Sequence, residues 1–117
     1  VPLTPETKGL FNHGFIKKFK KLMFLLNTAR GGIISNNMVV SLLKDETILG
    51  AGLDVLENEK LQTMTFEQRE DFEYLANAEN VLLTPHVGGW SHESYRRINE
   101  IMVDKLENLQ LIPKPNQ

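Results

Sequence analysis

The sequence predicts an α/β fold built on a parallel sheet. Three apolar runs of strand length occupy residues 22–26, 48–55 and 80–83, and continuous apolar runs suit parallel strands that are covered on both faces. Segments of helical pattern separate and follow these runs, and strands that alternate with helices are typical of a parallel α/β sheet. The 117 residues allow one domain with a real core.

Four helices are expected, one before the first strand and the others between and after the strands. A short one begins at residue 12 or 13 and reaches residue 20, and a second runs from residue 35 or 36 to about residue 44. Thr65 is the expected N-cap of a third helix. The residues expected to anchor this helix against the body are Phe66, Phe72, Tyr74 and Leu75. Ser91 is the expected N-cap of the last helix, in which apolar residues recur at positions 95, 98, 102, 106 and 109. Glu93 in its first turn suits the positive end of the helix dipole.

The composition is that of an ordinary globular protein. Hydrophobic residues make up 41% of the chain, charged residues make up 24%, and the net charge is −2, so nothing points to nucleic acid or to a membrane surface as a partner. The absence of cysteine excludes disulfides, cysteine catalysis and thiolate metal sites, and the three histidines have no metal-ligand spacing. No apolar run approaches the roughly 20 residues that span a bilayer. We expect a cytoplasmic protein without a metal.

His86 has the most suggestive setting of the polar residues. It stands between the rigid Pro85 and a pair of glycines, which let the backbone approach a ligand closely. Arg30 follows the first predicted strand, Asp54 ends the second, and His86 follows the third. The carboxyl ends of parallel strands share one edge of a sheet, where open α/β sheets bind their ligands. We therefore expect these side chains to converge there.

Together with Glu59, on the loop after Asp54, these residue types suit acid–base chemistry on a small acid. A glutamate beside a histidine stabilises the imidazolium and fixes the ring, so His86 could move one proton. The planar fork of Arg30 can grip a carboxylate through two hydrogen bonds. Asp54 could accept a hydrogen bond from an amide donor or balance a cationic ring.

Each of these four residues also has a structural alternative. His86 could be a loop residue at a strand end, and Arg30 could form a structural ion pair. Glu59 could lie at the surface or cap a helix, and Asp54 could cap the turn that follows it. The histidines at positions 13 and 92 are expected to have no catalytic role, and the lysines between residues 17 and 21 are expected to form a solvated helix face.

Four segments of the chain carry a resemblance to a known family. They are PLTPET at residues 2–7, NTARG at 27–31, GAGLDVLENE at 50–59 and TPHVGG at 84–89. In this order they resemble the D-isomer-specific 2-hydroxyacid dehydrogenases, and four motifs at compatible separations are far more specific than any one of them. The resemblance covers nearly the whole chain. It implies hydride transfer between NAD and a small 2-hydroxy or 2-oxo acid, with NADP not excluded.

The resemblance implies a role for each matching residue. Arg30 would bind the substrate carboxylate, Glu59 would be the partner of the catalytic histidine, and His86 would exchange a proton with the carbonyl oxygen. Asp54 would hydrogen-bond the nicotinamide carboxamide. The residues implied at the cofactor are Val1, Thr28, Ala29, Arg30, Asp54, His86, Gly88 and Gly89.

Two features depart from the family pattern. Lys60 stands where the family usually has a proline after the glutamate, which alters the rigidity of the loop. The phosphate-binding G-x-G-x-x-G is absent, because the Gly-Ala-Gly at residues 50–52 lies inside a predicted strand. We therefore expect a piece of a longer protein. Residues 1–90 would be the C-terminal half of a Rossmann-like NAD-binding domain, and residues 91–117 a crossover helix and tail that pack on a substrate domain outside this chain.

The resemblance leaves the parent protein with two possible functions. In the first, it is an NAD-dependent dehydrogenase and a homodimer, as such enzymes commonly are. In the second, it is a non-catalytic member of the same fold that senses NAD, like a corepressor, or binds another protein. The particular acid is not readable from this chain, because the side-chain pocket would lie largely in the substrate domain.

Overall fold

The computed structural model describes residues 1–112, which fall into two compact units. The first is Val1–His86, and the second begins at Val87. The expected division after residue 90 stays a prediction.

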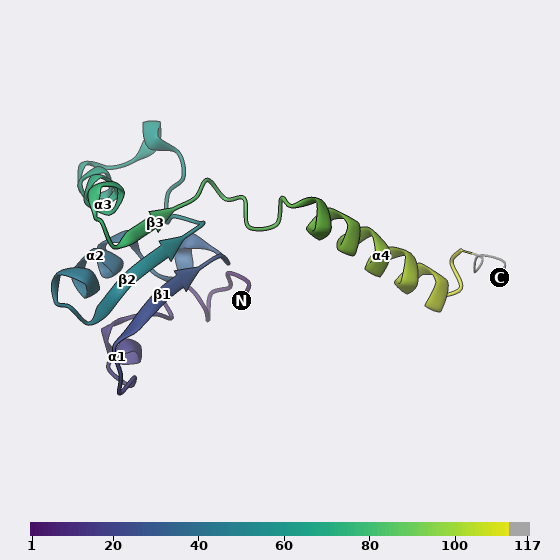
Figure 1. Cartoon of the computed structure of the whole chain (residues 1–117), viewed down its shortest axis with the longest axis horizontal. Helices are drawn as coiled ribbons and strands as arrows, with labels where there is room; N and C mark the ends of the chain where they lie inside the picture. The colour runs from purple at the N-terminus through teal and green to yellow at the C-terminus, as the bar shows by residue number, and fades with distance from the viewer. Residues whose placement is uncertain (113–117) are drawn as a thin grey trace. The chain divides into compact units, whose positions relative to one another are not determined.

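The first unit is built on a three-stranded parallel sheet, as the sequence predicts (Figure 1). Its strands are β1 (Met23–Asn27), β2 (Ile48–Leu53) and β3 (Val81–Leu83), in the order β1-β2-β3. Leu53 pairs with Asn27 on one side and with Leu83 on the other, so all three strands end in register. The loops that follow the strands therefore leave from one edge of the sheet.

The helices of this unit begin close to where the sequence places them. They are α1 (His13–Ile16), α2 (Asn36–Lys44) and α3 (Phe66–Asn77), with single 3-10 turns at Gly31–Ile33 and Leu61–Thr63. Ser35 caps α2, and its hydroxyl accepts the Met38 N–H. Thr65 caps α3 in a capping box whose second member is Gln68. The N-cap at Thr65 confirms the sequence expectation, and α2 begins at the residue expected for it.

Helix α1 is shorter than expected, because it ends at Ile16 and not at residue 20. Four lysines within residues 17–21 would place like charges on adjacent turns of a continued helix, which disfavours it. These lysines are solvent-exposed, as expected, but the expectation that they form a helix face is wrong, since they lie in the turn and loop that lead to β1. The aromatic rings of Phe11, Phe15 and Phe19 contact one another in turn along this segment, with centroids 4.7 and 5.8 Å apart and the ring planes of each pair tilted by 57°.

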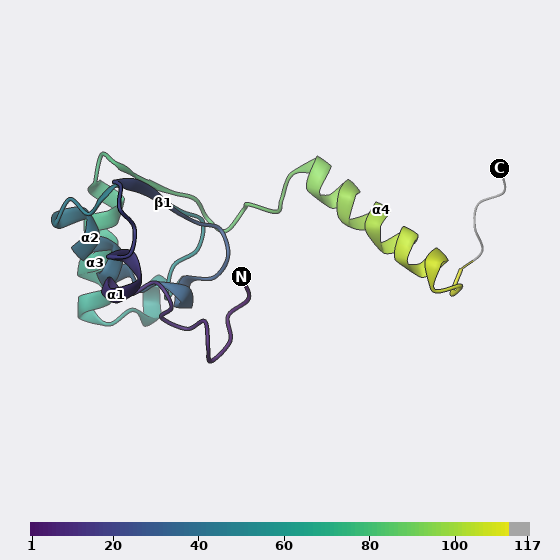
Figure 2. The same ribbon diagram turned by 90° about the horizontal axis from the view of Figure 1, so that it is seen from below.

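The core lies between one face of the sheet and the helices α2 and α3, which Figure 2 shows on the same side of the strands. Leu25 and Ala51 face these helices, and Leu42 and Leu75 are fully buried among them. The opposite face carries Phe24, Leu26 and Leu82, which are 68%, 76% and 66% exposed. The sequence predicts that both faces of the sheet are covered, but within residues 1–112 only the face toward α2 and α3 is covered.

The second unit contains α4 (His92–Asn108), which Ser91 caps by accepting the Ser94 N–H at 3.1 Å. This confirms the expected N-cap. The apolar side chains at helical spacing along α4, among them Tyr95, Ile98 and Met102, are exposed. No helix in residues 1–112 is long and apolar enough to cross a membrane. Packing of α4 on a further domain stays a prediction.

The N-terminus of α4 is expected to respond to acid. Hydrogen bonds from the Glu93 backbone N–H and then from the Ser91 hydroxyl lower the pKa of the Glu93 carboxyl below its usual range. The stabilisation of the helix start by these bonds is therefore fully present above the ordinary pKa of a glutamate, and it is lost as the pH falls below that value and through the lowered pKa. The amide NMR shifts of residues 91–95 should move toward unfolded values in that range.

Glu93→Gln is the matched control for this acid response. It keeps the size of the side chain without its titration, so the shifts of residues 91–95 should lose most of their change in that pH range. An unchanged acid response in the variant would contradict the assignment to Glu93.

Candidate functional site

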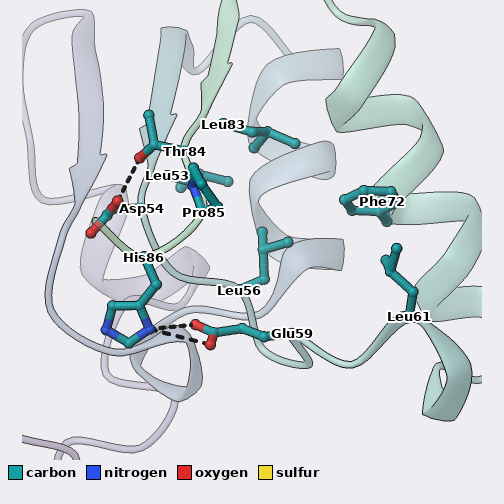
Figure 3. Close-up of a pocket in the computed structure, with 10 residues that line it drawn as sticks. All are labelled: Leu53, Asp54, Leu56, Glu59, Leu61, Phe72, Leu83, Thr84, Pro85 and His86. Atoms are coloured by element: carbon teal, nitrogen blue, oxygen red, sulfur yellow. Dashed lines mark hydrogen bonds and ion pairs between the residues drawn. The ribbon is translucent and has the colours of Figure 1, made fainter. Parts of the chain in front are cut away.

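His86 and Glu59 form a side-chain pair at the carboxyl edge of the sheet (Figure 3). Nδ1 of His86 lies 3.1 Å from Oε1 and 3.2 Å from Oε2 of Glu59, and both side chains are 47% exposed. The histidine comes from the loop after β3 and the glutamate from the loop after β2. The structure thus brings together two residues that are 27 positions apart in the sequence. A carboxylate beside Nδ1 favours a proton on that nitrogen, and Nε2 is then left for a different partner.

The loop that carries Glu59 is ordered by side-chain hydrogen bonds around Lys60. The backbone N–H of Lys60 donates to Oδ1 of Asn58 at 3.0 Å, and its carbonyl accepts the Thr63 hydroxyl at 3.0 Å. A proline at position 60 could not donate the first of these bonds. Hydrogen bonds therefore order the loop in place of a rigid ring, and Glu59 still reaches His86.

The backbone of His86 is in the left-handed region, with φ of 56°. Two other non-glycine residues in 1–112 share this conformation, Glu46 and Gln110, and both lie directly after helices, where it is common. His86 instead lies in a tight loop, in which its own backbone N–H donates to the Thr84 carbonyl at 3.0 Å. Residues in such sparsely populated conformations cluster at functional sites.

Asp54 is a buried carboxylate at the end of β2, with only 6% of its surface exposed. Its Oδ1 accepts the Thr84 hydroxyl at 2.5 Å, and its backbone N–H donates to the Asn27 carbonyl at 2.9 Å. Sequence reasoning missed this role of Thr84, although the residue lies in the motif around His86. The sequence did carry a signal for this bond, because Asp54 directly follows β2, Thr84 directly follows β3, and the last residues of these two strands are paired.

The loop after β1 is shaped by Asn27, another residue that sequence reasoning did not single out. Its side chain is buried and bonds the backbone twice, accepting the Ala29 N–H and donating to the Arg30 carbonyl, each at 3.1 Å. Nη1 of Arg30 donates to the Ala29 carbonyl at 2.6 Å. Arg30 is exposed and does not line the pocket beside His86. The structure therefore places Arg30 at the predicted edge, on the loop after β1, and outside the lining of this pocket.

A pocket of about 450 Å³ opens beside the His86–Glu59 pair (Figure 3). Four of its ten lining residues are polar, and three of the apolar ones, Leu56, Leu61 and Phe72, come from the segment between β2 and β3. The apolar wall was not predicted as part of a site. The pocket is lined by Leu53, Asp54, Leu56, Glu59, Leu61, Phe72, Leu83, Thr84, Pro85 and His86.

A second hollow, of about 170 Å³, contains three of the residues that the resemblance implies at a cofactor. Val1, Thr28 and Ala29 line it together with apolar residues of β1 and of the loop that leads to α2. Gly88 and Gly89 belong to the second unit. Within residues 1–112, no three histidine, aspartate or glutamate side chains lie close enough together to hold a metal ion.

Residues 1–88 match the family model described as D-isomer specific 2-hydroxyacid dehydrogenase, NAD binding domain. The chain is 38% identical over 109 residues to a glycerate dehydrogenase of Methylorubrum extorquens, which covers 92% of this chain and 32% of that protein. It is 39% identical over 106 residues to a glyoxylate reductase of Pyrococcus horikoshii, and this match covers 91% of this chain and 29% of that protein. The chain thus spans about a third of the length of these curated relatives.

Solved structures of the same kind share the fold. The D-lactate dehydrogenase of Aquifex aeolicus in complex with NAD and lactic acid superposes with a TM-score of 0.72, at 28% identity, over 93% of this chain and 35% of that one. A D-isomer specific 2-hydroxyacid dehydrogenase of Xanthobacter autotrophicus in complex with NADPH gives a TM-score of 0.60, at 33% identity, over 74% and 26%. Proteins of this fold thus occur with either nicotinamide cofactor.

Proposed function

The chain belongs to the D-isomer specific 2-hydroxyacid dehydrogenase family, and we propose that it supplies the catalytic half of the NAD-binding domain of such an enzyme. The reaction would pass a hydride between NAD(H) and a small D-2-hydroxy or 2-oxo acid. The observation that carries the proposal is the His86–Glu59 pair at 3.1 Å, on the edge of the sheet where the loop of Arg30 and the end of β2 also lie. The site residues keep the roles expected from the sequence.

His86 would be the proton donor and acceptor of the reaction. Glu59 faces Nδ1, so it would orient the ring and stabilise the charged form, which leaves Nε2 for the substrate oxygen. When the nicotinamide is bound, it supplies or accepts the hydride. In the direction of reduction, the proton of His86 goes to the carbonyl oxygen as the hydride reaches the carbon.

Arg30 would hold the substrate carboxylate. Its guanidinium is exposed, and Nη1 is bonded to a neutral carbonyl of its own loop. A carboxylate would accept two parallel, charge-assisted hydrogen bonds from the same group, which are stronger than a bond to a neutral acceptor. Binding of an acid would then orient the 2-oxo group for His86.

The residues at this edge fit a nicotinamide cofactor. The buried Asp54 carboxylate is suited to accept from the carboxamide, and Val1, Thr28 and Ala29 line one hollow beside β1. Arg30, His86, Gly88 and Gly89 would complete the cofactor contacts. Either NAD or NADP could serve, because the acidic or basic residue that distinguishes them would follow the glycine-rich loop that this chain lacks. The parent enzyme would be a homodimer in the cytoplasm.

The test is turnover by the full-length polypeptide that carries these 117 residues. Oxidation of NADH, followed at 340 nm, is measured with glyoxylate, hydroxypyruvate and pyruvate, and NADPH is compared at the same concentrations. Saturable turnover with at least one acid is expected. Tight NADH binding without turnover of any acid would contradict the dehydrogenase and favour the non-catalytic, NAD-sensing alternative.

The 117-residue chain by itself is expected to bind NAD weakly. Dinucleotide affinity depends strongly on backbone N–H groups of a glycine-rich loop at a helix N-terminus, and this sequence contains no such loop. Calorimetric titration of the chain with NAD should give no micromolar binding. A dissociation constant in the micromolar range would contradict this prediction and place the phosphate contacts within these residues.

A further inference from the structure

Thr84 lies between two of the groups that the proposed reaction uses. Its hydroxyl donates to Oδ1 of Asp54 at 2.5 Å, and its backbone carbonyl accepts the His86 N–H at 3.0 Å. We infer that Thr84 is a positioning residue, which sets the orientation of the Asp54 carboxylate toward the nicotinamide carboxamide. This inference rests on the proposed function.

The position of Thr84 is itself fixed by the sheet. Its backbone N–H donates to the Leu53 carbonyl at 3.0 Å, which extends the pairing of β2 and β3 by one residue. The hydroxyl is therefore held against the residue that follows Leu53, namely Asp54. The sheet thus fixes the backbone of Thr84 beside Asp54, and the hydroxyl bond to Oδ1 holds its side chain toward the carboxyl group.

The bond from Thr84 to Asp54 is short, and it partners a buried side chain. Burial of a polar group is costly unless that group is hydrogen-bonded. Asp54 is 94% removed from solvent, so Thr84 replaces part of the water that an exposed carboxylate would bind. The bond also limits rotation of the carboxylate about its Cβ–Cγ axis, and that rotation decides where its oxygens meet an amide donor.

Thr84→Val tests the inference in the full-length protein. Valine keeps the branched shape of threonine and removes only the hydroxyl donor. The dissociation constant for NADH is expected to rise about tenfold or more. Affinity for ADP-ribose, which lacks the nicotinamide, should change by less than about twofold. A residue that merely stabilised the fold would not separate the two ligands.

Two further variants complete the experiment. Thr84→Ser keeps the hydroxyl and should restore NADH affinity to within about threefold of the wild-type value. Thr47→Val is the matched control, because Thr47 immediately precedes β2 at the opposite end of the sheet from the site. It should leave affinity for both ligands unchanged. If Thr84→Val does not fold, Thr84→Cys, a weaker donor of similar size, should give a smaller loss of NADH affinity with the same selectivity.

The outcomes separate this inference from the proposed function. Equal losses of NADH and ADP-ribose affinity, or unchanged NADH affinity in Thr84→Val, would overturn the positioning role and leave the proposed function standing. A wild-type protein that neither binds NADH nor turns over a 2-oxo acid would overturn the proposed function, and this inference with it.

Discussion

His86→Asn is expected to lower the kcat of the full-length enzyme by about 10²- to 10⁴-fold. Asparagine removes the imidazole but tolerates the left-handed conformation of this residue, with its φ of 56°, better than most side chains. An alanine variant would combine the loss of the proton donor with backbone strain. The asparagine variant therefore isolates the chemistry, and steady-state oxidation of NADH with the preferred acid measures it.

The matched control for His86→Asn is His13→Asn. His13 is the exposed first residue of α1, and asparagine is acceptable at that position. We expect its kcat to stay within about twofold of wild type. A kcat for His86→Asn within tenfold of wild type, or equal losses in the two variants, would remove His86 from the role of proton donor.

Glu59→Gln should also lower the kcat of the full-length enzyme, but by a smaller factor than His86→Asn. Glutamine keeps an acceptor oxygen for Nδ1 of His86 and removes the negative charge that stabilises the imidazolium. The ring stays oriented while its charged form loses its partner. The structure supports this separation because both carboxylate oxygens lie within 3.2 Å of Nδ1.

The sequence could predict the strands and the edge of the site because both depend on local pattern. Runs of apolar residues mark the strands, and polar residues directly after them must emerge at the shared carboxyl edge of a parallel sheet. This reasoning placed Arg30, Asp54 and His86 at the loops where the structure has them. It also anticipated that Glu59 would lie beside His86, because the loops that carry the two residues leave the same edge of the sheet, and the family resemblance implied the same pair.

What the sequence could not predict depends on tertiary register and packing. The bond between Thr84 and Asp54 follows from the alignment of β2 with β3, which no local pattern encodes. Phe72 appeared in the sequence as a helix anchor, yet it also lines the pocket beside the His86–Glu59 pair because of the path that α3 takes. The bond of Arg30 to the carbonyl of Ala29 is equally a result of how one loop closes on itself.

Gly31 lies where the loop that carries Arg30 packs against the backbone of residues 56 and 57, so its size affects the position of Glu59. A Cβ atom at this position would lie 1.9 Å from the carbonyl oxygen of Leu56 and 2.5 Å from the backbone nitrogen of Glu57. These are backbone atoms, so no side-chain rotation can relieve the contact. The loop that carries Arg30 thus packs directly on the segment that leads to Glu59.

Gly31→Ala is therefore expected to destabilise the first unit by about 3 kcal/mol or more. For a unit of this size, that loss would lower the melting temperature by roughly 10 to 20 °C, as thermal unfolding followed by circular dichroism would measure. Gly89→Ala is the matched control, since a Cβ there meets no atom within 4 Å. Equal melting temperatures for the two variants would contradict the close packing. Any Gly31→Ala protein that does fold must shift residues 56 and 57, which would move Glu59 away from His86 and lower kcat as well.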